Sequence, residues 1–198
     1  MTRYLVDWSG AEEVTGIRYI CGYCGADTAP AYGFISLPDK PDRMGIIAIC
    51  TNCNRPTFVE TEKGQIVSIT PSKRMGAEIA GLPNDVEKLY EEARSCTASN
   101  AYTAAVLTCR KILMHIAVEK GAQPNLSFVD YIDYLAGKGY IPPDGKEWVD
   151  YIRTKSNEAN HEIIVMIQDD AKDLINFVEM LLRLVYEFKQ RLPKKTTP

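Results

Sequence analysis

"CGYC" at residues 21–24 and "CTNC" at residues 50–53 are two C-x2-C pairs, separated by residues 25–49. Each pair places two thiolates on one side of a tight turn, and two such turns complete a tetrahedral set of sulfur ligands that suits Zn²⁺. The predicted ligands of one structural zinc ion per chain are Cys21, Cys24, Cys50 and Cys53. Four protein ligands leave no coordination position for water, so the predicted metal is structural rather than catalytic. The alternative is four unligated or redox-active thiols.

The residues around the cysteine pairs have the composition of short β-strands. Four segments are rich in aromatic and β-branched residues, and turn signals such as "PDKPD" and "EKG" separate them. These segments are "YGFISL" (32–37), "GIIAIC" (45–50), "PTFVE" (56–60) and "QIVSIT" (65–70). A β domain this small needs a staple, which a metal ion can supply. The sequence therefore predicts a zinc-ribbon β domain over residues 1–81.

The remainder of the chain, residues 82–198, has the periodicity of α-helices. Val86, Leu89, Tyr90 and Ala93 recur at the spacing of one helical face. Further helices are predicted over residues 100–121, 126–139 (with Ser127 as the N-cap), 145–156 and 169–192. The predicted fold class is α+β: a small N-terminal β zinc ribbon followed by an all-α helical bundle.

The overall composition narrows the classes of function. The net charge is −3 and basic and acidic residues are balanced along the chain, so a contact with RNA would need a local site. No run of apolar residues is long enough to span a membrane, and the first residues lack the pattern of a signal peptide. The expected location is the cytoplasm, where cysteines are more often thiols or metal ligands than disulfides.

A polar segment, "IRTKSNEANH" at residues 152–161, carries the candidate catalytic residues. Arg153, Asn157 and His161 follow one another at four-residue spacing. On a continuous helix such residues drift only about 40° per step, which predicts that they line one polar cleft. An arginine binds phosphate through paired donors, and an imidazole transfers protons near neutral pH. In the structural alternative, Asn157 caps a helix, His161 bonds a backbone carbonyl and Arg153 pairs with a nearby carboxylate.

The helical segments also follow one another in a specific order of motifs. They are "LPNDVEKLYEEA" (82–93), "YTAAVLTCRKIL" (102–113), "FVDYIDYLAGKG" (128–139), "IRTKSNEANH" (152–161) and the acidic opening "DDA" (169–171). Over about residues 82–192, this set resembles the HEPN-like family catalogued as domain of unknown function 4145. The resemblance implies a helical bundle that pairs as a dimer and an N-terminal zinc ribbon.

Many HEPN-type domains are metal-independent ribonucleases, and the resemblance assigns the catalytic role to Arg153, Asn157 and His161. In that chemistry a base deprotonates the ribose 2′-hydroxyl, an acid protonates the leaving 5′-oxygen, and a cation stabilises the charged phosphorane. The commonest family signature has arginine immediately before asparagine. Here that position is Ser156, and the arginine lies three residues earlier. Enzymatic activity is therefore one of two alternatives.

Two functions from different classes are expected. The first is a metal-independent endoribonuclease or RNA-binding effector of a prokaryotic conflict or phage-defence system, a placement that the resemblance implies. The second is a non-catalytic scaffold, whose helical bundle dimerises and whose ribbon binds a protein or nucleic-acid partner. A homodimer is also predicted, because the last helix carries more apolar surface than a thin bundle can cover. The residues of this surface are Leu174, Ile175, Val178, Leu181, Leu182, Val185 and Phe188.

Other reactive side chains in the helical half have structural explanations. Cys96 and Cys109 lie on apolar helix faces and are expected to be small core residues. His115 stands among apolar residues and is expected to be packed or at an interface. Arg110 and Lys111 match a position that is often basic in the family. For them an arginine–carboxylate tie within the bundle and a phosphate contact are the two alternatives.

Overall fold

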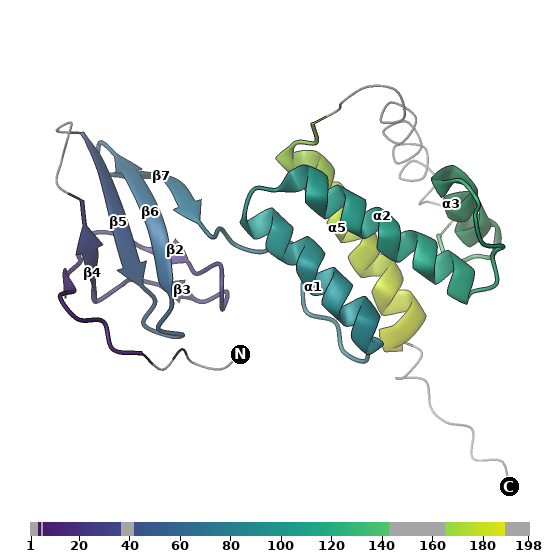
Figure 1. Cartoon of the computed structure of the whole chain (residues 1–198), viewed down its shortest axis with the longest axis horizontal. Helices are drawn as coiled ribbons and strands as arrows, with labels where there is room; N and C mark the ends of the chain where they lie inside the picture. The colour runs from purple at the N-terminus through teal and green to yellow at the C-terminus, as the bar shows by residue number, and fades with distance from the viewer. Residues whose placement is uncertain (1–3, 5, 37–41, 143–164, 189–198) are drawn as a thin grey trace, which may run out of the picture. The chain divides into compact units, whose positions relative to one another are not determined.

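The computed structural model describes residues 4, 6–36, 42–142 and 165–188, and it divides into two compact units (Figure 1). The first, here called the β unit, comprises residues 1–74 with 98–100, and the second, the helical unit, comprises 75–97 with 101–198. An antiparallel β-sheet precedes the helices, which confirms the predicted α+β class.

The β unit contains a five-stranded antiparallel sheet with strand order β1-β4-β5-β6-β7 (Figure 1). Its strands are β1 (Glu12–Glu13), β4 (Tyr32–Ile35), β5 (Arg43–Ile49), β6 (Pro56–Glu62) and β7 (Gln65–Thr70). A separate two-stranded hairpin is formed by β2 (Tyr19–Ile20) and β3 (Asp27–Thr28). The four strands predicted from composition correspond to β4 to β7.

The alternating pattern of β5 and β6 gives the sheet two different faces. In the register, Ile46 pairs with Val59 and both are buried, whereas the adjacent pair, Ile47 and Phe58, is 40% and 42% exposed. Directly opposed residues share a face, so the two pairs lie on opposite sides of the sheet. The inner face belongs to a small core that also holds the cysteine cluster. This core consists of Val14, Tyr19, Cys21, Ile46, Ala48, Cys50, Cys53 and Val59.

In the helical unit, each described helix begins close to its predicted first residue. The helices are α1 (Asn84–Ala98), α2 (Tyr102–Glu119), α3 (Phe128–Gly137) and α5 (Gln168–Leu182), and α5 continues into the π-helical turn η2 (Arg183–Glu187). Ser127 caps α3 as predicted, because its hydroxyl accepts a hydrogen bond from the Asp130 N–H at 3.2 Å. The helix predicted over residues 145–156 lies outside the described residues. Of the described helices, none has the length and apolar character of a membrane span.

The core of the helical unit is formed mainly by α2, α3 and α5. It buries Ile112, Leu113 and Ile116 of α2 completely or nearly so, and Cys109 is fully buried among them as predicted. The sequence predicted that seven apolar residues of the last helix exceed what the bundle covers. For six of them this is wrong, because they are buried within the bundle. These are Leu174, Ile175, Val178, Leu181, Leu182 and Val185, whereas Phe188 is 51% exposed.

The chain that enters the helical unit is clamped by side chains of α1 and α5. Arg94 donates hydrogen bonds to the carbonyl oxygens of Met75 (3.2 Å) and Gly76 (3.1 Å), and the Ala77 N–H donates to Glu179 Oε2 (2.8 Å). Gly76 has a φ of +71°, and a Cβ there would lie 2.5 Å from the hydroxyl oxygen of Tyr90. The left-handed backbone and the close tyrosine together require glycine at this position.

Gly76→Ala is expected to destabilise the helical unit by about 2–4 kcal/mol, the sum of left-handed strain and overpacking. The measurement is urea unfolding followed by the helical circular dichroism signal. Gly139→Ala is the matched control, because Gly139 has a φ of +77° but nothing within 4 Å of its Cβ position. The control should lose only about 1 kcal/mol. Equal losses in the two variants would contradict the packing argument.

Candidate metal centre

The two cysteine pairs occupy the turns of two β-hairpins in the β unit. The first turn connects β2 and β3, where Ile20 pairs with Asp27, and the second connects β5 and β6, where Ile49 pairs with Pro56. Each C-x2-C sequence therefore sits at the end of a hydrogen-bonded ladder. The hairpin register fixes the direction in which each pair of thiols points.

The same backbone hydrogen bonds hold both turns. In each, the residue after the second cysteine donates its N–H to the carbonyl of the first: Gly25 to Cys21 and Asn54 to Cys50, both at 2.8 Å. In each, the N–H of the first cysteine donates in return to the carbonyl five residues later, at 2.9 and 3.0 Å. Gly25 and Asn54 have φ values of +71° and +61°, a conformation that glycine and asparagine adopt most readily. The two turns are thus equivalent in their hydrogen bonds and in the left-handed residue that follows the second cysteine.

The four thiols meet at one point. Their sulfur atoms all lie within 4.8 Å of one another, with Cys21 to Cys53 at 3.7 Å and Cys24 to Cys50 at 3.8 Å. A disulfide needs a sulfur–sulfur distance of about 2.05 Å, so these thiols are not bonded to each other. Four sulfurs placed tetrahedrally at about 2.3 Å from a metal would be about 3.8 Å apart. The predicted ligand set is therefore brought together in a geometry that can hold a metal ion.

Hydrogen bonds and burial act in opposite directions on the thiols. Burial raises the pKa of Cys21 and Cys53 above the ordinary value. Burial also acts to raise the pKa of Cys24, but hydrogen bonds from the Asn52 side chain, at 3.5 Å, and from the Ala26 backbone outweigh it. The pKa of Cys24 is lowered to about 7. Donors to sulfur stabilise the thiolate, which is the form that binds metal.

The N-terminal segment is bound to the second turn through Asn54. The Asn54 side-chain amide donates to the carbonyls of Tyr4 (2.9 Å) and Val6 (2.8 Å), and the Tyr4 N–H donates to the Cys53 carbonyl (2.9 Å). The half-buried Trp8 donates its indole N–H to the Asn54 carbonyl at 3.2 Å. This segment is thus held against the second cysteine turn, through contacts between distant residues that no local sequence pattern indicates.

The first turn is packed tightly against the residues that follow β7. A Cβ added to Gly22 would lie 2.3 Å from the Pro71 carbonyl oxygen and 2.4 Å from that of Ser72. No side chain fits at such distances, which explains why the first cysteine pair encloses a glycine. The position of the first pair of thiols therefore depends on the end of the sheet as well as on the hairpin.

The candidate catalytic residues, Arg153, Asn157 and His161, lie outside the described residues, so their predicted common cleft stays a prediction. His115 is exposed and not packed in the core, contrary to one of its two expected settings. It is exposed because it faces an open pocket between α1 and α2.

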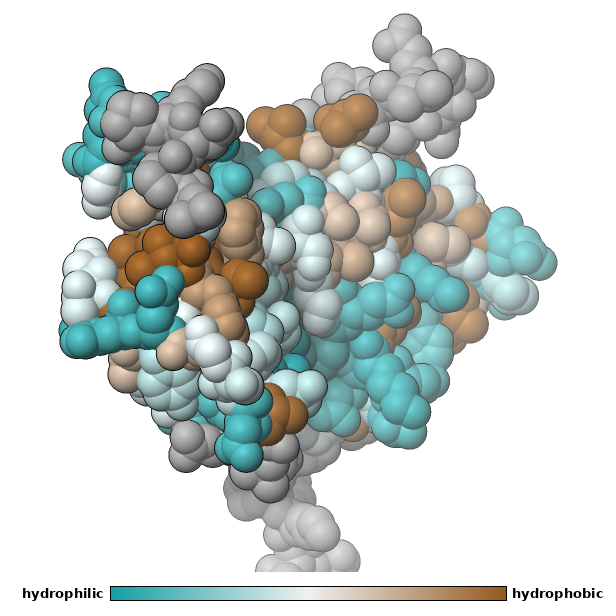
Figure 2. Space-filling view, turned by 60° about the vertical axis from the view of Figure 1, so that its left-hand side comes forward, coloured by the Kyte–Doolittle hydropathy of each residue, from teal (hydrophilic) through white to brown (hydrophobic). Residues whose placement is uncertain are grey.

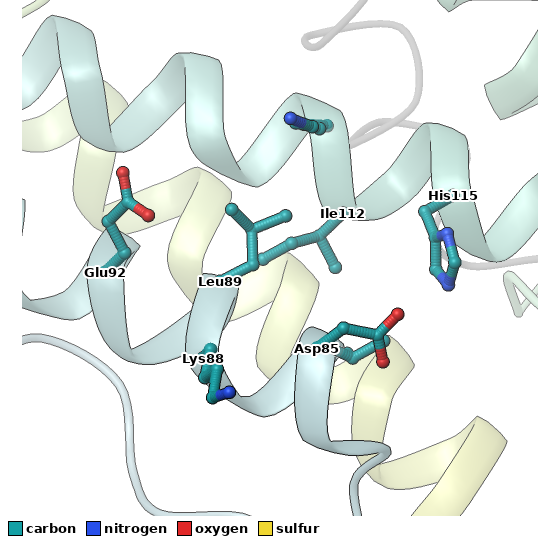
Figure 3. Close-up of a pocket in the computed structure, with 8 residues that line it drawn as sticks. Asp85, Lys88, Leu89, Glu92, Ile112 and His115 are labelled. Carbon is teal, nitrogen blue, oxygen red and sulfur yellow. The ribbon is translucent and has the colours of Figure 1, made fainter.

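His115 lines a pocket between α1 and α2 with a volume of about 360 Å³. The lining residues are Asp85, Val86, Lys88, Leu89 and Glu92 of α1 and Lys111, Ile112 and His115 of α2. Asp85 and His115 lie near one end, and Leu89 and Ile112 meet in the middle (Figure 3). Two carboxylates and two lysines balance in charge around an apolar centre. The pocket is formed by the faces of two helices, so neither sequence segment predicts it alone.

The fold and the site define a class of protein: a β unit with a cluster of four cysteines that can hold a metal ion, joined to a helical unit. A family model described as Domain of unknown function (DUF4145) matches residues 91–197, and the chain belongs to this family. No curated protein and no solved structure matches the chain. The matched range contains Arg153, Asn157 and His161 but none of the four clustered cysteines. The metal centre is therefore supported by its own geometry and not by the family.

Cys50→Ser is expected to lower the metal content from one ion per chain to near zero and to unfold the β unit. The helical circular dichroism signal should persist, because the two units have separate cores. Metal content is measured by elemental analysis of freshly purified protein. Cys96→Ser, in the helical unit, is the control and should keep the metal. A wild-type protein with well under one metal ion per chain would contradict the site.

Proposed function

We propose that this chain is an RNA-directed protein: a metal-independent endoribonuclease or RNA-binding effector of a prokaryotic conflict or phage-defence system, with a HEPN-like helical unit. The observation that carries the proposal is the position of the polar motif within the family match. Residues 91–197 include Arg153, Asn157 and His161 at four-residue spacing. Arginine, amide and imidazole are together sufficient to bind a phosphodiester, orient it and transfer protons to and from the ribose oxygens.

The proposed chemistry assigns one role to each side chain. His161 takes the proton of the ribose 2′-hydroxyl, whose oxygen then attacks the adjacent phosphorus. Arg153 stabilises the negative charge that develops on the phosphorane oxygens, and Asn157 orients the phosphate. A second His161, supplied by a two-fold partner, would protonate the leaving 5′-oxygen. The reaction cleaves the phosphorus–oxygen bond and leaves a cyclic phosphate and a free 5′-hydroxyl.

We also propose that the metal is Zn²⁺ and that its role is structural. Thiolate sulfurs in a tetrahedral set suit zinc, and the sulfur–sulfur distances of 3.7 and 3.8 Å match zinc–sulfur bonds of about 2.3 Å. All four positions are filled by protein ligands, so zinc has no place for a water nucleophile. This closed site supports an RNA chemistry that does not use the metal.

Cleavage of RNA in EDTA tests the enzymatic proposal. His161→Ala should lower the cleavage rate by about 10²-fold or more, the usual contribution of a general acid–base group. Arg153→Ala should also lose activity, whereas Ser156→Ala, the matched control between them, should not. Zinc content and helical signal are measured on the same samples, so loss of activity is separated from loss of folding. Normal cleavage by His161→Ala would contradict the assignment.

The second candidate function, a non-catalytic scaffold whose β unit binds a partner protein, is favoured by the outer face of the sheet. Phe34, Ile47 and Phe58 stand opposite one another across β4, β5 and β6 and form an apolar row on this face. Apolar side chains are visible at the molecular surface in Figure 2. Such rows are common in protein interfaces. Wild-type protein that cleaves no RNA, with or without EDTA, would favour this candidate.

We propose further that the helical unit forms a two-fold homodimer. Met180 of α5, Leu184 of η2 and Phe188, directly after η2, recur at four-residue spacing and are 38%, 41% and 51% exposed. The candidate interface is therefore this exposed stripe and not the buried apolar residues of the same helix. A self-complementary stripe on one helix suits a two-fold contact.

Light scattering at micromolar concentration should give twice the chain mass of 22.2 kDa. Leu184→Asp should give the monomer mass with unchanged helical content, because it places a charge in the centre of the apolar stripe. Leu107→Asp is the control, since Leu107 is exposed on α2 and should leave the dimer intact. A wild-type protein with the mass of one chain would contradict the dimer.

A further inference from the structure

Arg110 lies half-buried between α2 and α3, with its guanidinium over an aromatic ring. The guanidinium carbon is 4.4 Å from the centroid of the Phe128 ring, and Phe128 is the buried first residue of α3. At this distance the cation stacks on the ring and holds a defined orientation. The face of the guanidinium is thus occupied, while its N–H groups lie in the plane at its edge.

Most other arginines that the structure describes are neutralised by carboxylates. The ion pairs are Arg18–Asp27, Arg43–Glu60, Arg94–Glu91 and Arg183–Glu179. Arg55 lies over the rings of both Tyr4 and Tyr23, at 5.8 and 5.1 Å. Arg110 has one ring contact and, within the described part of the chain, no ion pair. The predicted alternative of an arginine–carboxylate tie is therefore not formed there.

The setting of Arg110 is unfavourable for a cation without an anion. Burial lowers its pKa from the ordinary value, which reflects the loss of water around the charge. Asp130, two residues after Phe128, is engaged in the cap of α3, where its carboxylate accepts hydrogen bonds from the Ser127 hydroxyl (2.6 Å) and N–H (3.3 Å). One interaction with an aromatic ring offsets only part of the cost of desolvating a charge. Among the described residues, no acceptor is bound to the planar N–H donors of Arg110, which can therefore bind a ligand.

We propose that Arg110 is a phosphate-binding residue that uses the N–H edge of its stacked guanidinium. The planar fork of donors matches the oxygens of a phosphate group, and stacking on Phe128 fixes the fork before the ligand arrives. The ligand is a phosphodiester of RNA, an identification that rests on the proposed function. Inorganic phosphate shares the same chemistry, so the experiment has a separate arm for each.

The first arm measures how the affinity for a single-stranded oligonucleotide depends on salt. The probe is a 2′-O-methyl oligoribonucleotide, which lacks the nucleophile and cannot be cleaved. Each phosphate contact on a single strand contributes about −0.7 to the slope of log affinity against log salt. Arg110→Gln should reduce the slope by about that amount and weaken binding about tenfold or more. Arg110→Lys should keep the slope but lose part of the affinity, because it keeps the charge without the fork.

Lys111→Gln is the matched control. It removes the same charge from the next residue of α2, but Lys111 lines the pocket between α1 and α2 instead of facing Phe128. A general electrostatic attraction would make the two variants equivalent, whereas a phosphate contact at Arg110 leaves Lys111→Gln close to wild type. Helical circular dichroism of each variant confirms that the fold is retained.

The second arm titrates inorganic phosphate into the wild-type protein and follows the Arg110 Nε–H resonance by NMR. Oligonucleotide binding that weakens in Arg110→Gln but not in Lys111→Gln supports the proposal. Binding that is equal in Arg110→Gln and wild type overturns it while leaving the proposed function in place. If no oligonucleotide binds but phosphate shifts the resonance, the RNA function is contradicted and the phosphate site stands with free phosphate as its ligand. If the oligonucleotide does not bind and phosphate does not shift the resonance, both the RNA function and the phosphate site are contradicted.

Discussion

The β unit depends on the requirement that four sulfur atoms from two hairpins occupy one coordination sphere. The thiols lie within 4.8 Å of one another, and the small core around them contributes only a few apolar side chains. A metal bound at this point converts part of its binding energy into folding energy. The equivalent hydrogen bonds of the two turns, the glycine at position 22 and the segment held by Asn54 all serve to fix these sulfurs.

The proposed closed metal site implies separate roles for the two units. Because the cysteines fill the tetrahedron, the proposed RNA chemistry has to come from side chains of the helical unit. In that unit, the proposed phosphate-binding residue is Arg110, which lies over Phe128, and the proposed proton-transferring motif contains Arg153 and His161; the chain has no net positive charge. Local sites, rather than a general attraction to polyanions, are therefore the basis of the proposed contact with RNA.

The sequence predicted the local features of this structure, but of its contacts between distant segments it predicted only the meeting of the two cysteine pairs, which a shared metal ion would require. The C-x2-C spacing defines a turn by itself, and Ser127 with Asp130 defines a helix cap within four residues. The periodicity of the last helix placed Leu181 on its apolar face. It could not show whether the bundle covers this residue, because its burial depends on packing against α2. The positive φ of Gly76 and the role of Asn54 arise from contacts with distant segments. The motif around His161 stays a prediction.

X-ray absorption at the zinc edge of the purified protein tests the central claim most directly, because it reports the atoms bound to the metal. Four sulfur neighbours at about 2.3 Å, with no nitrogen or oxygen ligand, are expected if Cys21, Cys24, Cys50 and Cys53 form the complete first shell. A mixed shell of sulfur with nitrogen or oxygen would mean an incomplete cysteine set and an open position at the metal. Such a spectrum would contradict both the closed structural site and the division of roles between the two units.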